Sequence, residues 1–383
     1  MGMPSYEFVY GPKLIAGSGS AARLGGLLPP GRCLFVTDEK LRSLGLAEAS
    51  LDSLAQAGIE PIIFDSVEQD PSLETLLGAV SAGDGCSSVV GFGGGSPMDV
   101  AKLAAYLIGS GDELDLIWGV GKALGSGLPL ALVPTTAGTG SEATAVSVIT
   151  VGGSAKNAVN SPPLLARWAV LDPELTVNLP RPVTAATGID AMVHAIEAYA
   201  SKSANNNPVS KMLAREALRL LGANIETAVF NGRDVGARGA MLLGSMLAGQ
   251  AFANSPVAAV HALAYPIGGT FHVPHGLSNA LVLPHVLRFN APEAAHLYAE
   301  IACDAFPHLS GEQGTQALCA AFIEELAGLS KKLGMSTRLR EVKIGEEHLQ
   351  KMAADAMKQT RLLVNNPRAV AESDALAIYR AAW

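Results

Sequence analysis

The stretch VVGFGGGSPMDVAK, residues 89–102, passes from an apolar run through three glycines into a helical pattern. Its first four residues are typical of a strand that is buried on both faces, as the strands of parallel sheets are. We expect Ser96 to cap the helix, Pro97 to occupy its first position and Asp99 to complete a capping box. The glycines and the helix N-terminus favour a site for the phosphates of a nucleotide. A tight strand-to-helix turn without a ligand would fit the same residues.

Similar apolar runs recur on both sides of this stretch and are separated by helical patterns such as that of residues 41–58. The predicted strands are CLFVT (33–37), PIIF (61–64), SVVGF (88–92), LALV (130–133) and WAVL (168–171). Strands that are apolar on both faces and spaced by helices belong to parallel sheets covered on both sides. Residues 1–180 are therefore predicted to form a doubly wound α/β domain that binds a dinucleotide.

The pattern changes after residues 171–182, LDPELTVNLPRP, where proline and aspartate mark a junction between domains. The chain beyond it gives almost only helical patterns, for example SKMLAREALRLLGANIETAV and ARGAMLLGSMLAGQAFA. Apolar residues that recur with a period near that of the α-helix indicate amphipathic helices. We predict an all-helical domain over residues 181–383.

The composition of the 383-residue chain is that of a protein with extensive apolar cores, because 49% of its residues are hydrophobic and only 16% are charged. So much apolar surface also favours a homo-oligomer, a dimer or larger. The net charge of −8, without a basic stripe, argues against nucleic acid as a partner. We find neither a signal peptide nor an apolar run long enough for a membrane span, so no membrane association is expected. Four scattered cysteines without a CxxC pair indicate the reduced thiols of a cytoplasmic protein.

A second glycine-rich loop competes for the phosphate. Residues 14–28, LIAGSGSAARLGGLL, contain G-x-G-x-x-A at Gly17, Gly19 and Ala22, and Asp38 follows about twenty residues later, as in the dinucleotide fingerprint. The helix after this loop would be short, because two prolines follow it. The residues alone therefore favour the three-glycine loop without excluding this one.

Asp38 lies just after a predicted strand and allows two interpretations. It fits the N-cap of the next helix, and it fits a carboxylate that binds the ribose of NAD, which would favour NAD over NADP. Another polar loop, PTTAGTGSEAT (134–144), directly follows a different predicted strand. Its hydroxyl groups would suit phosphate or ribose, and the same loop would also serve as a plain connection. Open α/β sheets bind their ligands at the strand ends where these residues lie.

Two segments of the helical domain carry side chains typical of a divalent metal site. TGIDAMVHAIEAYAS (187–201) places Asp190 and His194 four residues apart, on one face of a helix. HALAYPIGGTFHVPHG, which begins at His261, adds His275. One carboxylate and three imidazoles without a cysteine suit Fe²⁺ or Zn²⁺ and leave room for a substrate oxygen. Alternatively, Thr187 and Asp190 form a capping box at the start of this helix, and His194 is an ordinary core histidine.

Together these motifs resemble those of the iron-containing (group III) alcohol dehydrogenase family. GGGSPMDVAK resembles its phosphate loop, PTTAGTGSEAT its second nucleotide loop, GIDAMVHAIEAY its first metal helix and HALAYPIGGTFHVPHG its second metal segment. The resemblance extends from VYGPKLIAGSGS to NNPRAVAESDALAIYRAAW, essentially the whole chain. It implies hydride transfer between NAD and a small alcohol or aldehyde at a metal ion, Fe²⁺ or Zn²⁺, in a cleft between the α/β and helical domains.

Carried over residue by residue, the resemblance implies two sets of site residues. The metal ligands are Asp190, His194, His261 and His275. The cofactor contacts are Asp38, Gly93, Gly94, Gly95, Ser96, Thr135 and Thr136, with Ser141, Thr144 and Lys156 as further neighbours of the cofactor. The loop from Gly17 to Ala22 is then structural.

The chain departs from the family pattern at two positions. Many members have a histidine four residues after the first ligand of the second metal segment, where this chain has Tyr265. Tyr265 and His272 are therefore the candidates for proton transfer during catalysis. Asp70 stands where members commonly have an asparagine near the cofactor, which adds a negative charge.

Two other enzyme classes with a related architecture stay open. Maleylacetate reductases act on a dicarboxylate without an obvious need for metal. Dehydroquinate-synthase-like lyases combine NAD with a metal, but they need basic residues to hold a phosphate-bearing substrate, and residues 251–287 contain no Lys or Arg. Activity with a simple alcohol, measured with and without a chelator, distinguishes a metal-dependent alcohol dehydrogenase from the first class. Net formation of NADH distinguishes it from the second. A metal-binding protein without catalysis would not explain two nucleotide loops.

Overall fold

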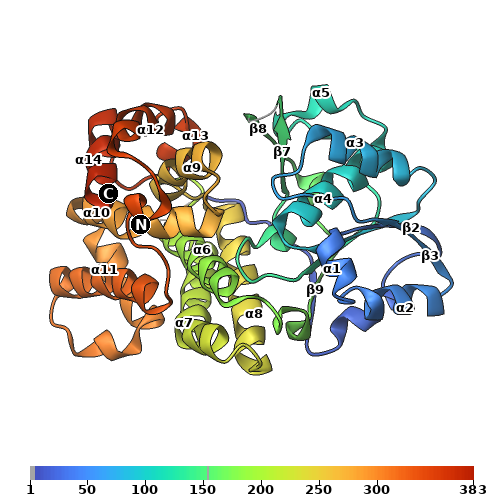
Figure 1. The fold of residues 1–383 in the computed structure, drawn as a ribbon, viewed down its shortest axis with the longest axis horizontal. Coiled ribbons are helices and arrows are strands. Elements are labelled where there is room, and N and C mark those ends of the chain that lie inside the picture. The colour runs from blue at the N-terminus through green and yellow to red at the C-terminus, as the bar shows by residue number, and fades with distance from the viewer. Residues whose placement is uncertain (1–4, 153–154) are drawn as a thin grey trace. The chain divides into compact units, whose positions relative to one another are not determined.

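The computed structural model describes residues 5–152 and 155–383 and separates into two compact units (Figure 1). Tyr10–Asn178 form one unit, and Leu179–Trp383 form the other together with the segment that ends at Val9. The N-terminal segment therefore groups with the helical unit, although we assigned it to the α/β domain. Paired hydrogen bonds attach it there: Val9 N donates to Asn254 Oδ1 at 2.7 Å and Asn254 Nδ2 donates to Val9 O at 3.0 Å, and Glu7 exchanges a similar pair with the side chain of Asn205.

A six-stranded sheet with the order β1-β9-β6-β4-β2-β3 forms the centre of the α/β unit, and all its pairings are parallel. Residues of β2 alternate between two cores, because Leu34 and Val36 pack in one and Cys33 and Phe35 in the other. Helices α3 (Leu73–Ala82) and α4 (Gly95–Ser110) cover the first face and α2 (Glu48–Gln56) covers the second (Figure 1). The predicted doubly wound α/β architecture is therefore confirmed. The strands are β1 (Lys13–Ala16), β2 (Gly31–Val36), β3 (Ile59–Phe64), β4 (Ser88–Gly93), β6 (Leu130–Pro134) and β9 (Trp168–Leu171).

A second, three-stranded sheet was not predicted. Strands β7 (Val146–Val151) and β8 (Ala155–Asn160) pair antiparallel, and β5 (Gly119–Val120) adds to β8. Strand β7 packs beside α4, where Ile149 and Val159 join the same core as α3 and α4. The helices of this unit are α1 (Glu39–Ser43), α2 (Glu48–Gln56), α3 (Leu73–Ala82), α4 (Gly95–Ser110) and α5 (Leu114–Ile117).

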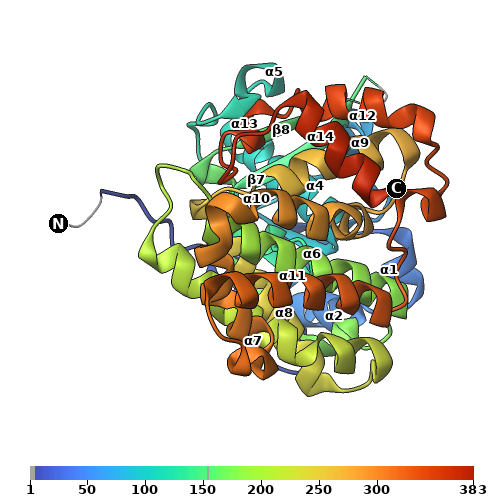
Figure 2. The same cartoon turned by 90° about the vertical axis from the view of Figure 1, so that its left-hand side faces the viewer.

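Helix α6 (Arg181–Ala200) is the central helix of the second unit, which is helical as predicted. Every residue from Gly188 to Ala200 is buried, and α6 packs against α7, α8 and α10. Figure 2 shows α6 between α10 above it and α7 and α8 below it. Polar side chains on such a helix must find partners inside the protein. The other helices are α7 (Pro208–Phe230), α8 (Val235–Asn254), α9 (Ala259–Phe271), α10 (His275–Ala305), α11 (Thr315–Lys332), α12 (Leu349–Ala356), α13 (Thr360–Leu363) and α14 (Glu372–Ala382).

None of the helices in the described part of the chain is long and apolar enough to cross a membrane.

Candidate functional site

The glycine turn after β4 differs in detail from its prediction. Helix α4 begins at Gly95 with Gly94 as its N-cap, so Ser96 is not the cap and Pro97 lies within the first turn. The missing N–H group of Pro97 costs no hydrogen bond at that position. Gly93 has a φ of 151°, and a Cβ atom there would lie 2.7 Å from Pro97 Cγ, so only glycine fits. The first turn of α4 thus offers backbone N–H groups that the helix itself does not pair.

Asp99 does not complete a capping box as predicted, because groups distant in sequence hold its carboxylate. Its Oδ1 accepts from Ser141 Oγ at 2.7 Å, and its Oδ2 accepts from Val148 N at 3.0 Å. Buried Lys102, which sequence reasoning did not single out, lies 3.1 Å from Asp99 Oδ1 and donates to Thr144 Oγ1 at 3.3 Å. These contacts fasten the loop of residues 134–144 to α4, and they engage the hydroxyl groups of Ser141 and Thr144 inside the unit.

The glycine turn and the start of the second nucleotide loop lie side by side. Thr135 N donates to Gly93 O at 2.9 Å, and a Cβ atom on Gly94 would lie 3.7 Å from Thr136 Oγ1. Both segments follow the carboxyl ends of neighbouring parallel strands, β4 and β6. Open α/β sheets bind their ligands at this edge.

Asp38 and Lys156 already contact other groups of the α/β unit. Asp38 follows β2 and caps α1, where its Oδ1 accepts from Leu41 N at 2.9 Å. The capping interpretation of Asp38 is therefore confirmed, and it uses only one carboxylate oxygen. Lys156 on β8 forms an ion pair with Asp70, with Nζ 2.5 Å from Oδ1.

The competing glycine loop after β1 already holds an anion that belongs to the protein. The backbone N–H groups of Gly19 and Ala21 donate to Asp172 Oδ1 and Oδ2 at 3.2 and 3.0 Å. A phosphate would have to displace this carboxylate and would be repelled by its charge. The loop thus ties β1 to the end of β9, and the glycine turn after β4 is the better candidate for a phosphate site.

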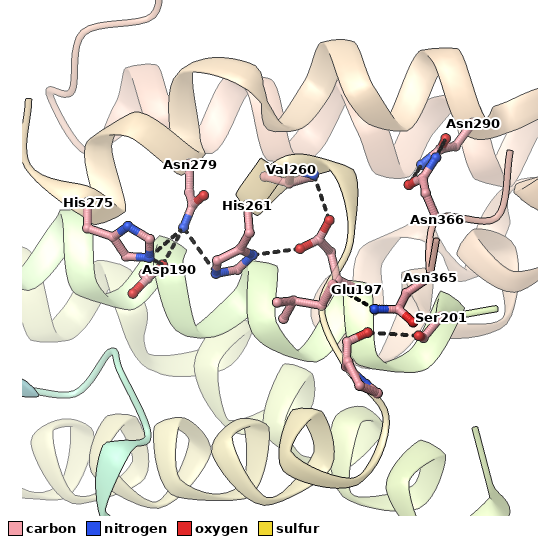
Figure 3. Close-up of polar contacts among 12 residues, drawn as sticks. Asp190, Glu197, Ser201, Val260, His261, His275, Asn279, Asn290, Asn365 and Asn366 are labelled. Atoms are coloured by element: carbon pink, nitrogen blue, oxygen red, sulfur yellow. Dashed lines mark hydrogen bonds and ion pairs between the residues drawn. The ribbon is translucent and has the colours of Figure 1, made fainter. Parts of the chain in front are cut away.

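One carboxylate and three imidazoles come together in the helical unit. The ligand atoms of Asp190, His194, His261 and His275 all lie within 4.8 Å of one another. Asp190 and His194 are one turn apart on α6, whereas His261 lies near the start of α9 and His275 begins α10. Figure 3 shows Asp190, His261 and His275 grouped around the side-chain amide of Asn279. We call these four ligand residues the Asp/His cluster.

The hydrogen bonding of the Asp/His cluster fits a divalent cation. Asn279 Nδ2 lies 2.6 Å from Asp190 Oδ1 and 3.3 Å from both His261 Nε2 and His275 Nε2. An amide has two N–H bonds and does not serve three acceptors at once. Among the described residues, Asn279 Oδ1 is buried without a hydrogen-bond partner. Three acceptors thus share one amide group, and a bound cation would relieve that shortage of donors.

The pKa directions in the Asp/His cluster agree with this interpretation. Burial raises the pKa of the Asp190 carboxyl, but the three histidines, when protonated, and the hydrogen bond from Asn279 outweigh burial and hold that pKa below its usual value. Burial lowers the pKa of His261, but the hydrogen bond and charge of Glu197, with the charge of Asp190, raise it above its usual value. The carboxylates therefore make this buried region attractive to positive charge.

Glu197 is a member of this region that sequence reasoning missed. Its Oε2 lies 2.6 Å from His261 Nδ1, and its Oε1 accepts from Val260 N at 2.7 Å (Figure 3). Glu197 follows Asp190 by seven residues and His194 by three, which places all three on one face of α6. That spacing could have identified Glu197 from the sequence, because a carboxylate on a buried helix face needs a partner.

The two candidates for proton transfer have different surroundings. Tyr265 lies one turn after His261 on α9, is half-buried, and has its ring centroid 6.4 Å from that of His275. His272 ends α9 in the left-handed region with a φ of 55°, and it is exposed. Its backbone N–H donates to Gly268 O at 3.0 Å, as in a helix C-cap. The ring of Tyr265 borders the Asp/His cluster, whereas the backbone of His272 closes a helix.

Comparison with known proteins gives matches over nearly the whole chain. Residues 11–173 match the family described as iron-containing alcohol dehydrogenase, and residues 184–383 match the Fe-containing alcohol dehydrogenase family, C-terminal. The chain is 42% identical over 358 residues to long-chain-alcohol dehydrogenase 1 of Geobacillus thermodenitrificans, with 91% of this chain and 89% of that protein covered. It is 32% identical over 380 residues to the NAD-dependent methanol dehydrogenase of Bacillus methanolicus, with 98% and 99% covered. A solved structure of a 1,3-propanediol oxidoreductase superposes with a TM-score of 0.94 at 34% identity, covering 99% of this chain and 100% of that one.

Proposed function

The chain belongs to the iron-containing alcohol dehydrogenase family and is an oxidoreductase, and we propose that it transfers hydride between NAD(H) and an alcohol or its aldehyde with the help of a bound Fe²⁺. The observation that carries this proposal is the Asp/His cluster on α6, α9 and α10. The glycine turn at the start of α4 supports the nucleotide half of the proposal. One relative is itself named an NAD-dependent methanol dehydrogenase, which agrees with NAD as the cofactor.

We propose Asp190, His194, His261 and His275 as the metal ligands, with Zn²⁺ as the alternative to Fe²⁺. A divalent ion held there supplies Lewis acidity, which lowers the pKa of an alcohol and polarises a carbonyl. Asn279 orients Asp190 through its amide. The side chain of His275 is 48% exposed, and we propose that the substrate approaches the cluster on that side.

The NAD site is proposed at the carboxyl ends of β2, β4 and β6. The N–H groups and dipole at the start of α4 would bind the pyrophosphate, and Asp38 the adenosine ribose. Ser141 and Thr144 would support the second loop from inside through Asp99 and Lys102. The proposed contacts are Asp38, Gly93, Gly94, Gly95, Ser96, Thr135 and Thr136, with Lys156 as a further candidate.

Replacing Asp38 with asparagine is expected to relax the preference for NAD over NADP. Asparagine keeps an oxygen that accepts from Leu41 N, so α1 stays capped. It removes the charge that would repel the 2′-phosphate of NADP. We expect the ratio of kcat/KM for NADP to that for NAD to rise about tenfold, a change of about 1.4 kcal/mol. Steady-state rates with both cofactors measure this ratio, and an unchanged ratio would place the ribose away from Asp38.

Tyr265 is the proposed route for the proton between substrate and solvent, with His272 as the second candidate. Tyr265→Phe removes the hydroxyl group but keeps the ring beside His275. We expect kcat to fall about tenfold, less than is usual for a general acid or base, because water reaches this half-buried residue and partly replaces the phenol. His272→Gln serves as the comparison. A larger loss in His272→Gln than in Tyr265→Phe would transfer the role to His272.

A panel of simple alcohols, read by the absorbance of NADH, tests the proposed function. Net NADH formation that depends on the alcohol and disappears with a chelator is the expected result. A lyase that recycles its cofactor would form no net NADH, and a maleylacetate reductase would keep its activity in the chelator. We also propose a reducing, cytoplasmic location, because all four cysteines of the chain are unpaired.

A further inference from the structure

Glu197 joins two helices through both oxygens of one buried carboxylate. Its side chain is 4% exposed, and it projects from α6 to the start of α9 (Figure 3). Oε2 lies 2.6 Å from His261 Nδ1, and Oε1 accepts from Val260 N at 2.7 Å. Among the residues described, no lysine or arginine contacts this carboxylate. Burying such a charge is costly unless hydrogen-bond donors replace the water that it loses.

The first contact fixes which nitrogen of His261 carries the proton. A carboxylate accepts hydrogen bonds, so Nδ1 must be the donor and is protonated. In the neutral ring, Nε2 then keeps its lone pair on the side that faces Asn279 and the rest of the cluster, 3.3 Å from Asn279 Nδ2. A metal binds only an unprotonated imidazole nitrogen. Glu197 therefore leaves His261 with one usable ligand atom, and that atom faces the Asp/His cluster.

The second contact fixes the backbone next to His261. Val260 lies in the first turn of α9, whose N–H groups have no acceptor within the helix. The N-cap residue Ala258 makes no side-chain cap. Glu197, on the neighbouring helix α6, instead accepts the hydrogen bond from Val260 N. One side chain therefore holds both the backbone just before His261 and the ring of His261. Position and tautomer of this ligand are set together.

We propose that Glu197 is a positioning residue that sets the tautomer and orientation of His261 and thereby the affinity of the Asp/His cluster for its divalent metal. This inference rests on the metal site proposed above. The carboxylate also makes the imidazole a stronger ligand, because its charge stabilises positive charge that the ring shares with the metal. Glu197 itself contributes no ligand atom.

The test measures metal binding directly, without turnover. Wild type, Glu197→Gln and Glu300→Gln are stripped of metal and titrated with Zn²⁺ against a chromophoric chelator. Glutamine has the same shape as glutamate, but it has no charge and has one oxygen for two donors. Glu300→Gln is the matched control, because Glu300 accepts a hydrogen bond from Tyr199 at another contact of α6 with α10 and touches no ligand. We expect Zn²⁺ affinity to fall about 10- to 100-fold in Glu197→Gln and to stay unchanged in Glu300→Gln.

A spectroscopic measurement on the wild-type chain keeps the inference testable if Glu197→Gln does not fold. In Zn²⁺-loaded protein labelled with ¹⁵N-histidine, we expect a slowly exchanging Nδ1–H resonance from His261, shifted downfield by its bond to Glu197. Equal Zn²⁺ affinity in wild type and Glu197→Gln, or the absence of that resonance, would overturn the inference. Failure of the wild type to bind Zn²⁺, Co²⁺ or Fe²⁺ would instead overturn the proposed metal site.

Discussion

Replacing His261 with alanine is expected to remove the bound metal and the alcohol dehydrogenase activity together. His261 is one of the four proposed ligands, and its loss leaves the buried Glu197 carboxylate without its imidazole partner. A site with three ligands and an unpaired carboxylate nearby should not retain metal through purification. If Lewis-acid activation contributes about 4 kcal/mol to lowering the barrier, kcat/KM falls about a thousandfold. Metal content per chain and the rate of NADH formation are measured on the same samples.

His296→Ala is the matched control for this prediction, because His296 is an exposed histidine on α10 and belongs to neither proposed site. Metal content and kcat/KM are expected to remain at the wild-type level. Asp190→Asn provides a second ligand variant that keeps the shape of the side chain in case His261→Ala unfolds. A His261→Ala protein that loses its metal but turns over alcohol as wild type does would contradict the assignment of the cluster to catalysis.

Replacing Gly94 with valine is expected to raise the KM for NAD a hundredfold or more while the fold survives. Gly94 has φ −76° and ψ −163°, which β-branched residues adopt without strain. A Cβ atom there makes only ordinary contacts with Thr136, at 3.7 Å or more. The added methyl groups would occupy the space above the first turn of α4, where the pyrophosphate is proposed to lie. Losing two hydrogen bonds from backbone N–H groups to the charged pyrophosphate, at about 1.5 to 3 kcal/mol each, weakens NAD binding about a hundredfold or more.

Gly26→Val tests the specificity of the Gly94 effect. Gly26 lies in the same unit, a Cβ atom on it would meet nothing within 4 Å, and the residue ends the short helix of the competing glycine-rich stretch 14–28. We expect an unchanged KM for NAD. Cofactor titrations followed by intrinsic fluorescence, with melting curves of both variants, separate lost binding from lost folding. Weakened NAD binding in Gly26→Val and normal binding in Gly94→Val would return the phosphate to the competing loop.

Much of the fold could be predicted because its signals are local. The strands of the main sheet are apolar on both faces, as in VVGF and LALV, and only a sheet covered on both sides buries such runs. The antiparallel pair β7 and β8 was missed, although VSVITVGG combines alternation with a turn signal. The start of α4 was predicted two residues late, because local capping rules do not include the recruitment of Asp99 by Ser141 and Val148.

The candidate site also contains residues that the sequence pattern predicts and residues that only the packed structure reveals. Asp190 and His194 share a helix face and could be paired by spacing alone, and His261 and His275 stood out because the chain has few histidines. Glu197 pairs with His261 across 64 residues, and Asn279 pairs with Asp190 across 89. No periodicity connects such positions, so these supporting residues needed the packed helices to be found. The oligomeric state, the substrate and the metal in the cell stay predictions.

Stoichiometric reconstitution tests the central claim most directly. The protein is stripped of metal, shown by elemental analysis to be free of it, and titrated anaerobically with Fe²⁺ while NAD-dependent alcohol oxidation is followed. Our account predicts negligible activity at the start and a linear rise that ends at one Fe²⁺ per chain, with no such rise in His261→Ala. Full activity in the metal-free wild type, or an equal rise in His261→Ala, would contradict it.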